Sequence, residues 1–301
     1  MKTGILVPVW RDYTWVAPIT LETLRNRWAA HPEIWFCGLT EDEAGTLPAL
    51  PLAPGLDRSN WTQVLLGGVE QMRSRGFDLI YLILEEHLPV APCHAAHLNT
   101  TLPALMDSLP AAYISLMGWD NRRFSSRSPL LDKSQHQLKH LVGPHDPRFH
   151  LHPALWRADV LETCCRLALE DRNKNGSAWH FEKACARPGN PLPESATTAC
   201  YQIRASQLAM TKPSALQNIF SAVERFIFHK MMALYPLIPS RRAGAAFLRQ
   251  VPFDDVFCDG PYPMFYSGIM AKGQLNRFFV NFLQRKDPAL MNQLLKAMPR
   301  R

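Results

Sequence analysis

The fold is decided by residues 77–90, which read Phe77-Asp-Leu-Ile-Tyr-Leu-Ile-Leu-Glu-Glu-His-Leu-Pro-Val90. Their apolar run, 79–84, is too short to cross a membrane and is typical of a strand buried on both faces of a parallel sheet. The run ends in Glu85, Glu86 and His87, called the acidic turn below. Ligands of open α/β sheets bind outside the carboxyl ends of the strands. The acidic turn is therefore a candidate site for a divalent metal that carries a phosphate-bearing substrate, although a solvated surface turn fits the same residues.

The segments around this strand predict an α/β fold with a mostly parallel central sheet flanked by helices. Before the acidic turn, we expect strands at 4–9 and 34–37, a helix from about residue 18, a loop at 39–58 and a helix at 61–72. After it, we expect helices at 94–108, 154–169 and 177–185 and strands at 113–117, 149–153 and 201–204. Residues 118–148 are basic and show no periodic pattern, which predicts an irregular segment.

The composition limits the class of protein. A chain of 301 residues with 47% hydrophobic content can form one large α/β domain with a smaller addition. The net charge of +7 favours anionic partners such as nucleotides, but no dense Lys/Arg tract supports nucleic acid. Seven cysteines with no C-x-x-C pair indicate a reducing, cytosolic compartment. The sequence shows neither a signal peptide nor an apolar stretch of about 20 residues.

The last part of the chain has a different pattern. Amphipathic helices are expected at 216–235 and 274–298, separated by a Pro/Gly/aromatic stretch at 251–268. We therefore predict a sheet domain at 1–210 and a mainly helical extension at 211–301. The aromatic and basic residues of this extension could contact a membrane surface; packing against the sheet domain or another subunit is the alternative.

Five short segments occur in an order that resembles a known enzyme family. They are Ile5-Leu-Val-Pro-Val-Trp10, Asn60-Trp-Thr-Gln-Val-Leu-Leu66, Glu85-Glu-His87, Leu151-His-Pro-Ala-Leu-Trp-Arg157 and Ala178-Trp-His-Phe-Glu182. Together they resemble bacterial GT-A-type, family 2-like glycosyltransferases, which use nucleotide-diphosphate sugars. The resemblance implies a Rossmann-like GT-A sheet and transfer of the sugar, with inversion, to a glycan or lipid-linked hydroxyl acceptor. It also implies a role in cell-surface polysaccharide synthesis, in the cytoplasm or peripherally at the inner face of the membrane.

The same resemblance assigns roles to individual residues. Glu182 would be the catalytic base, and Glu86 with His87 would hold Mn²⁺ or Mg²⁺. The donor would contact Pro8, Trp10, Asp12, Trp61, Glu85, Glu86 and Arg157. The acidic motif is Glu-Glu-His where the family usually has aspartate and an aromatic residue. A non-catalytic relative that binds a sugar nucleotide or glycan is therefore the alternative function.

Two histidine pairs provide a different hypothesis, a metal hydrolase. His94 and His97 are three residues apart on an expected helix, and His150 and His152 share one face of an expected strand. Either pair could supply two metal ligands, but no further ligand follows at a diagnostic spacing such as H-E-x-x-H. Structural or surface roles are the alternative, as is lining of the acceptor cleft by His150 or His152. The sequence contains no P-loop, dinucleotide-binding or nucleophile-elbow motif.

Overall fold

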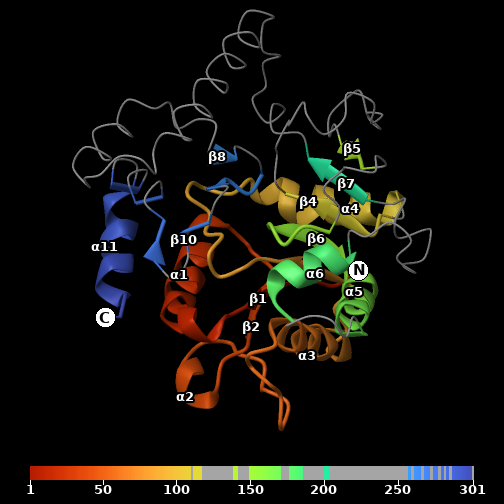
Figure 1. Ribbon diagram of the computed structural model, residues 1–301. Helices are drawn as coiled ribbons and strands as arrows, with labels where there is room; N and C mark the ends of the chain where they lie inside the picture. The colour runs from red at the N-terminus through yellow and green to blue at the C-terminus, as the bar shows by residue number, and fades with distance from the viewer. Residues whose placement is uncertain are drawn as a thin grey trace, which may run out of the picture.

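A seven-stranded sheet forms the centre of the protein in a computed structural model (Figure 1). The structure describes residues 1–109, 111–116, 138–141, 149–170, 176–185, 200–203, 257–258, 261–265, 268–271, 274–276, 279–280, 283–284 and 287–299. The strands are β1 (Thr3–Pro8), β2 (Glu33–Cys37), β3 (Leu79–Leu82), β4 (Tyr113–Ser115), β5 (Leu138–His140), β6 (Ala154–Arg157) and β7 (Cys200–Ile203). Their spatial order is β2-β1-β3-β6-β4-β7-β5.

The direction of the strands confirms the predicted fold class. β1 pairs in parallel with β2 and β3, and β4 pairs in parallel with β7. β6 is antiparallel to both β3 and β4, and β5 is antiparallel to β7. β2, β1, β3, β4 and β7 therefore run in one direction, and the chain has an α/β fold with a mostly parallel sheet.

Helices cover both faces of this sheet. They are α1 (Ala17–Arg27), α2 (Glu41–Ala44), α3 (Trp61–Ser74), α4 (Leu102–Ser108), α5 (Ala158–Glu170), α6 (Ala178–Cys185) and α11 (Pro288–Ala297). A 3₁₀ helix at Arg11–Val16 leads into α1, and a π-helical turn at His97–Thr101 leads into α4. Local signals explain where some of them begin: Pro18 lies in the first turn of α1, and the Asn60 side chain accepts a hydrogen bond from the Gln63 amide at 3.1 Å to cap α3.

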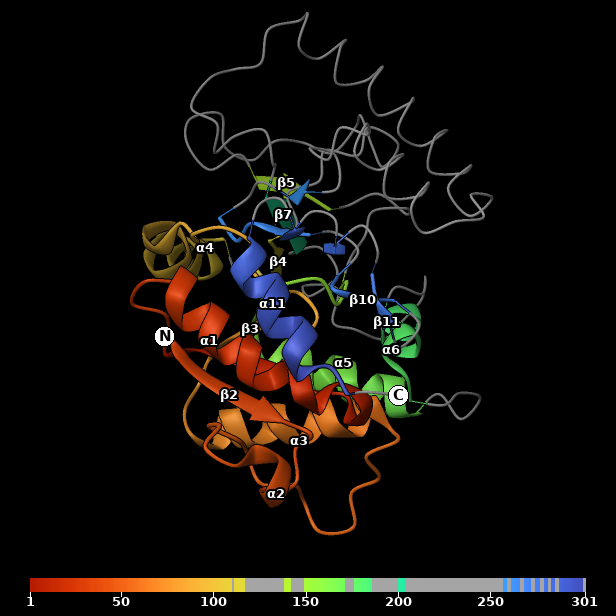
Figure 2. The same cartoon turned by 90° about the vertical axis from the view of Figure 1, so that its left-hand side faces the viewer.

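Alternate residues of the strands pack into two separate hydrophobic cores, one on each face of the sheet. Leu6 and Trp156 belong to a core under α3, α5 and α6, whereas Ile5 and Leu155 belong to a core under α1 and α4. This alternation follows from the two-residue period of a strand. Figure 2 shows α1 and α3 on opposite sides of β2.

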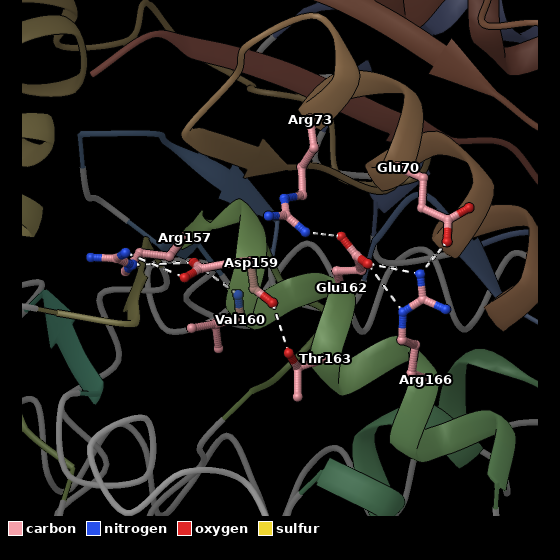
Figure 3. A network of polar contacts seen from close by, with 8 residues as sticks. All are labelled: Glu70, Arg73, Arg157, Asp159, Val160, Glu162, Thr163 and Arg166. Carbon is pink, nitrogen blue, oxygen red and sulfur yellow. Dashed lines mark hydrogen bonds and ion pairs between the residues drawn. The ribbon is translucent and has the colours of Figure 1, made fainter.

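The outer surfaces of α3 and α5 are joined by ion pairs (Figure 3). Glu162 contacts Arg73 of α3 and, at 2.8 Å, Arg166 one turn further along α5. Arg166 also reaches Glu70 at 2.5 Å. These charges are mostly solvent-exposed, so the apolar contacts beneath them contribute most to holding the two helices together.

The sequence prediction was wrong around residue 154. Residues 149–153, expected as a strand, form an irregular segment in which Phe149 has a φ of 56°. Ala154–Arg157, expected as the start of a helix, is strand β6, and α5 begins only at Ala158. The reason is that a strand buried on both faces is continuously apolar and cannot be distinguished by periodicity from the first turn of a buried helix.

The described part of 211–301 contributes strands as well as a helix. It contains β8 (Phe257–Cys258), β9 (Met264–Phe265), β10 (Met270–Ala271), β11 (Gln274–Leu275) and α11. The expected helix at 274–298 therefore begins with a short strand, while the expected helix at 216–235 lies outside the described residues. Most of the basic segment 118–148 lies outside them too, apart from β5 and Leu141.

Helix α11 packs along α1 (Figures 1 and 2). Its Leu290, Met291 and Leu294 are buried with Val16 and Ile19 in a third apolar cluster. Among the described residues, no helix combines the length and the apolar character that a membrane crossing requires.

Candidate functional site

The acidic turn lies at the carboxyl edge of the sheet, as the sequence predicts. Because Leu6 pairs with Leu82, β1 and β3 end side by side. Pro8, the last residue of β1, is buried at this edge, and the Trp10 amide donates a hydrogen bond to Glu85 Oε1 at 3.0 Å. The Thr20 hydroxyl of α1 donates to the Glu85 carbonyl oxygen at 3.2 Å. The structure therefore brings Pro8, Trp10 and Glu85 together from two neighbouring strand ends.

Burial strongly perturbs the ionisation of the acidic turn. Glu85 and His87 are only 4% and 6% exposed. Desolvation, reinforced by the charge of Glu86, raises the pKa of Glu85 to about 8, and desolvation raises the pKa of Glu86 to about 7. Burial lowers the pKa of His87 to about 4, so its imidazole is neutral at neutral pH. Such a site can gain a cation by releasing protons, because a bound positive charge favours ionised carboxylates.

A segment from near the C-terminus covers the acidic turn. The Ile269 amide donates to the Glu86 carbonyl oxygen at 2.9 Å, and the Tyr262 hydroxyl donates to the His87 carbonyl oxygen at 2.8 Å. At Gly268, where φ is 67°, an added Cβ would lie 3.2 Å from the Glu86 carboxyl group. Sequence analysis did not identify Tyr262 or Gly268 as neighbours of this site, and the Pro/Gly/aromatic character of 251–268 was the only available signal.

Three histidines connect the acidic turn to Glu182. The ring centroids of His87 and His152 are 5.1 Å apart, and those of His152 and His150 are 5.6 Å apart. His150 Nδ1 lies 3.3 Å from Glu182 Oε1, which also accepts a hydrogen bond from the Leu151 amide at 2.8 Å. We call His87, His152, His150 and Glu182 the histidine line. It joins the acidic turn to a carboxylate on α6.

Helix α6 holds Glu182 in a fixed place. The neighbouring Phe181 is fully buried, and His180 Nε2 lies 3.1 Å from the Ala168 carbonyl oxygen of α5. Burial alone would raise the pKa of Glu182, but hydrogen bonds from His150 and Leu151 outweigh it and hold the pKa below its ordinary value. The carboxylate is therefore ionised at neutral pH, in contrast to Glu85.

One group of three potential metal ligands converges within the described residues. His150, His152 and Glu182 place one ligand atom each so that all three lie within 4.8 Å of one another. Sequence analysis identified both histidines as a pair, but the third ligand comes from a separate helix. The pair His94 and His97 has ring centroids 6.1 Å apart and, within the described part of the chain, belongs to no such group.

Three further residues, Arg157, Trp61 and Asp12, were also expected to contact the donor. Because β6 is antiparallel to β3, Arg157 pairs with Leu79 at the opposite end of β3. At about 3.3 Å per residue, that end lies roughly 20 Å from the acidic turn. Its guanidinium contacts Asp159 at 3.2 Å, as Figure 3 shows. Trp61 is only 4% exposed and packs edge-on against Phe181 in the core. The side chain of Asp12 is 66% exposed and lies 3.7 Å from Arg11.

Comparison with known proteins gives only distant likenesses. No protein-family model matches the chain, and no curated protein sequence matches it. Among solved structures, 4-diphosphocytidyl-2C-methyl-D-erythritol synthase from Anaerococcus prevotii aligns with a TM-score of 0.37 and 10% identity over 73% of this chain and 94% of that one. S. aureus TarS 1–349 aligns with a TM-score of 0.37 and 11% identity over 96% of this chain and 74% of that one. At this level neither likeness carries an argument about the activity of the protein.

Proposed function

We propose that the protein is an inverting glycosyltransferase that moves a sugar from a nucleotide-diphosphate donor to a hydroxyl acceptor. The observation that carries the proposal is the histidine line, which brings Glu182 and the acidic turn into one continuous polar arrangement. An inverting transfer needs a donor-side group and an acceptor-side carboxylate that act on one bound substrate. Polar side chains at the carboxyl edge of the sheet lie where open α/β folds bind their ligands.

The acidic turn is the proposed donor side. Glu85 would face the nucleotide, close to the Trp10 amide that already contacts its carboxyl group. The residues present suit a divalent ion, because Glu86 offers a carboxylate and the buried Nδ1 of His87 has no hydrogen-bond partner among the described residues. An imidazole ligand favours Mn²⁺ over Mg²⁺. Such an ion, when bound, neutralises the charge of the departing diphosphate.

Glu182 is the proposed acceptor-side base. Its side chain is 20% exposed, so an acceptor hydroxyl can reach it from solvent. Its lowered pKa keeps the carboxylate ionised and able to accept a hydrogen bond from that hydroxyl. The bond from the Leu151 amide fixes the orientation of Oε1, which leaves Oε2 as the oxygen for the acceptor.

The setting of the reaction is a further part of the proposal. A glycan or lipid-linked acceptor in bacterial cell-surface polysaccharide synthesis would place the protein in the cytoplasm, peripherally at the inner face of the membrane. Helix α11 supports a surface contact, because Leu295 and Met298 are 51% and 39% exposed beside Lys296. Packing against another subunit would use the same exposed residues.

A donor-hydrolysis assay tests the proposed activity. The wild-type protein should release nucleoside diphosphate from one of a panel of UDP- and GDP-sugars in the presence of Mn²⁺. Glu86→Ala and Glu182→Gln should each lower that rate by about 100-fold or more, because each removes a charge that acts at the reacting groups. The matched control is Glu33→Gln, since Glu33 is 56% exposed at the start of β2.

The assay also separates the alternative function. A non-catalytic binding protein is favoured by the two hydrogen bonds that already engage Glu182, since they give that carboxylate a structural role. Donor binding without turnover, unaffected by Glu182→Gln, would establish that alternative and refute the transferase proposal.

A further inference from the structure

His150, His152 and Glu182 converge although they come from two separate elements. The histidines lie on either side of Leu151, which is buried and donates its amide hydrogen to Glu182 Oε1 at 2.8 Å. Glu182 comes from α6, whose position is fixed by the buried Phe181. The three potential ligand atoms lie within 4.8 Å of one another. A carboxylate on α6 and the segment before β6 therefore bring two imidazoles and one anionic oxygen close together.

The spacing of these atoms suits a tetrahedral transition-metal ion. Ligand atoms bound to one zinc ion at about 2.1 Å lie roughly 3.4 Å apart. His150 Nδ1 and Glu182 Oε1 are already 3.3 Å apart, and small side-chain rotations would bring in the His152 ring. The side chains of His150 and Glu182 are 34% and 20% exposed, so an ion can enter from solvent.

The donor set selects the class of ion. Mg²⁺ and Ca²⁺ prefer oxygen ligands, whereas imidazole nitrogen suits zinc and its neighbours in the transition series. Two histidines and one carboxylate form a three-ligand zinc site that leaves one position open. The ring of His87 lies next in line beyond His152, at 5.1 Å between centroids, so the acidic turn adjoins this cluster.

We propose that His150, His152 and Glu182 bind a zinc ion. This site differs in position and in ligand chemistry from the donor-side ion proposed at Glu86 and His87. Bound zinc would make Glu182 a metal ligand, so an acceptor hydroxyl would then bind to the ion rather than to the carboxylate. The zinc site itself does not depend on the transferase proposal.

Zinc content and affinity of the full-length protein test the proposal. Purified wild-type protein, incubated with zinc sulfate and dialysed, should retain one zinc ion per chain by elemental analysis. His152→Ala and Glu182→Gln should weaken zinc binding by at least about 10-fold in a competition titration with a chelating dye. Glu182→Gln keeps an oxygen that can accept the Leu151 hydrogen bond, so it tests the anionic ligand without removing the contact that holds the loop.

The second histidine pair provides the matched control. His94→Ala removes an imidazole from a pair that has no third ligand in the described part of the chain. The backbone amide of residue 94 can still donate its hydrogen bond to the Pro261 carbonyl oxygen in this variant. This variant should bind zinc as tightly as the wild type. Failure of the wild type to retain zinc, or unchanged affinity in both His152→Ala and Glu182→Gln, would overturn the proposal. Zinc retention without donor hydrolysis would sustain the zinc site and refute the transferase.

Discussion

Trp156→Ala should lower the free energy of unfolding by about 3 to 5 kcal/mol, because it removes the largest side chain from the centre of the sheet. Trp156 is fully buried on β6, between β3 and β4. Its ring lies 4.6 Å from Tyr113 and 5.4 Å from Phe149, measured between centroids. Such a loss is a large part of the roughly 5 to 15 kcal/mol that stabilises an ordinary domain, and urea denaturation would measure it.

Two further variants keep this prediction testable. Trp156→Phe retains an aromatic ring and removes an indole Nε1 that is buried without a hydrogen-bond partner among the described residues. Its cost should be below about 1.5 kcal/mol. Trp179→Ala is the matched control, because Trp179 is 72% exposed on α6 and its loss should change stability by less than about 0.5 kcal/mol. Equal effects of Trp156→Ala and Trp179→Ala would contradict the placement of β6 in the core.

Glu85→Gln should stabilise the protein at pH 8 by about 4 kcal/mol relative to the wild type, and by almost nothing at pH 4, because each unit by which the pKa of Glu85 is raised costs about 1.4 kcal/mol when the group is ionised. The pKa of Glu85 is raised from 4.5 to about 8 in the folded protein, because burial penalises its charged form. Between these two pH values the folded state binds more protons than the unfolded state, so wild-type stability falls as pH rises. A glutamine carries no charge, and its amide oxygen can still accept the Trp10 hydrogen bond.

The measurement is urea denaturation across this pH range with a chelator present, so that no bound cation offsets the buried charge. The difference between Glu85→Gln and the wild type should grow between pH 4.5 and 8 and then level off. Glu33→Gln, which alters a 56% exposed carboxylate, should show no such growth. A difference that stays constant with pH would mean that Glu85 does not carry a perturbed pKa.

The first half of the fold could be predicted because its signals are local. The apolar run 79–84, Pro18 in the first turn of α1 and Asn60 before α3 each specify an element from a few neighbouring residues. Three strands joined by helices then leave a parallel arrangement as the natural solution. This logic also predicted that Glu85 would lie at the carboxyl edge of the sheet.

The course of the chain after residue 149 could not be predicted in the same way. Ala154–Arg157 is antiparallel to its neighbours, and nothing in its four residues specifies that direction. The reversal carries Arg157 to the far edge of the sheet and places His152, which precedes the strand, beside His87 at the acidic edge. The sequence motif predicted that Arg157 binds the donor. The direction of β6, which the motif does not specify, determines where Arg157 lies.

The packing of the segment around Tyr262 and Gly268 against the acidic turn could not be predicted, for a different reason. The hydrogen bond from the Tyr262 hydroxyl to the His87 carbonyl oxygen joins residues that are 175 positions apart in the sequence. Such a contact depends on packing between distant segments, and no periodic pattern reports it. The contact between His150 and Glu182 is of the same kind, because it forms only when α6 packs against α5 and the loop before β6.

Titration calorimetry with nucleotide-diphosphate sugars measures whether the acidic turn is the donor site of a glycosyltransferase. We expect wild-type protein to bind a UDP- or GDP-sugar in the presence of Mn²⁺, with a Kd of about 1 μM to 1 mM. Glu86→Ala should weaken this binding at least about 10-fold, while Glu33→Gln should leave it unchanged. Donor binding of equal strength in Glu86→Ala, or no binding of any donor by the wild type, would contradict a donor site at the acidic turn.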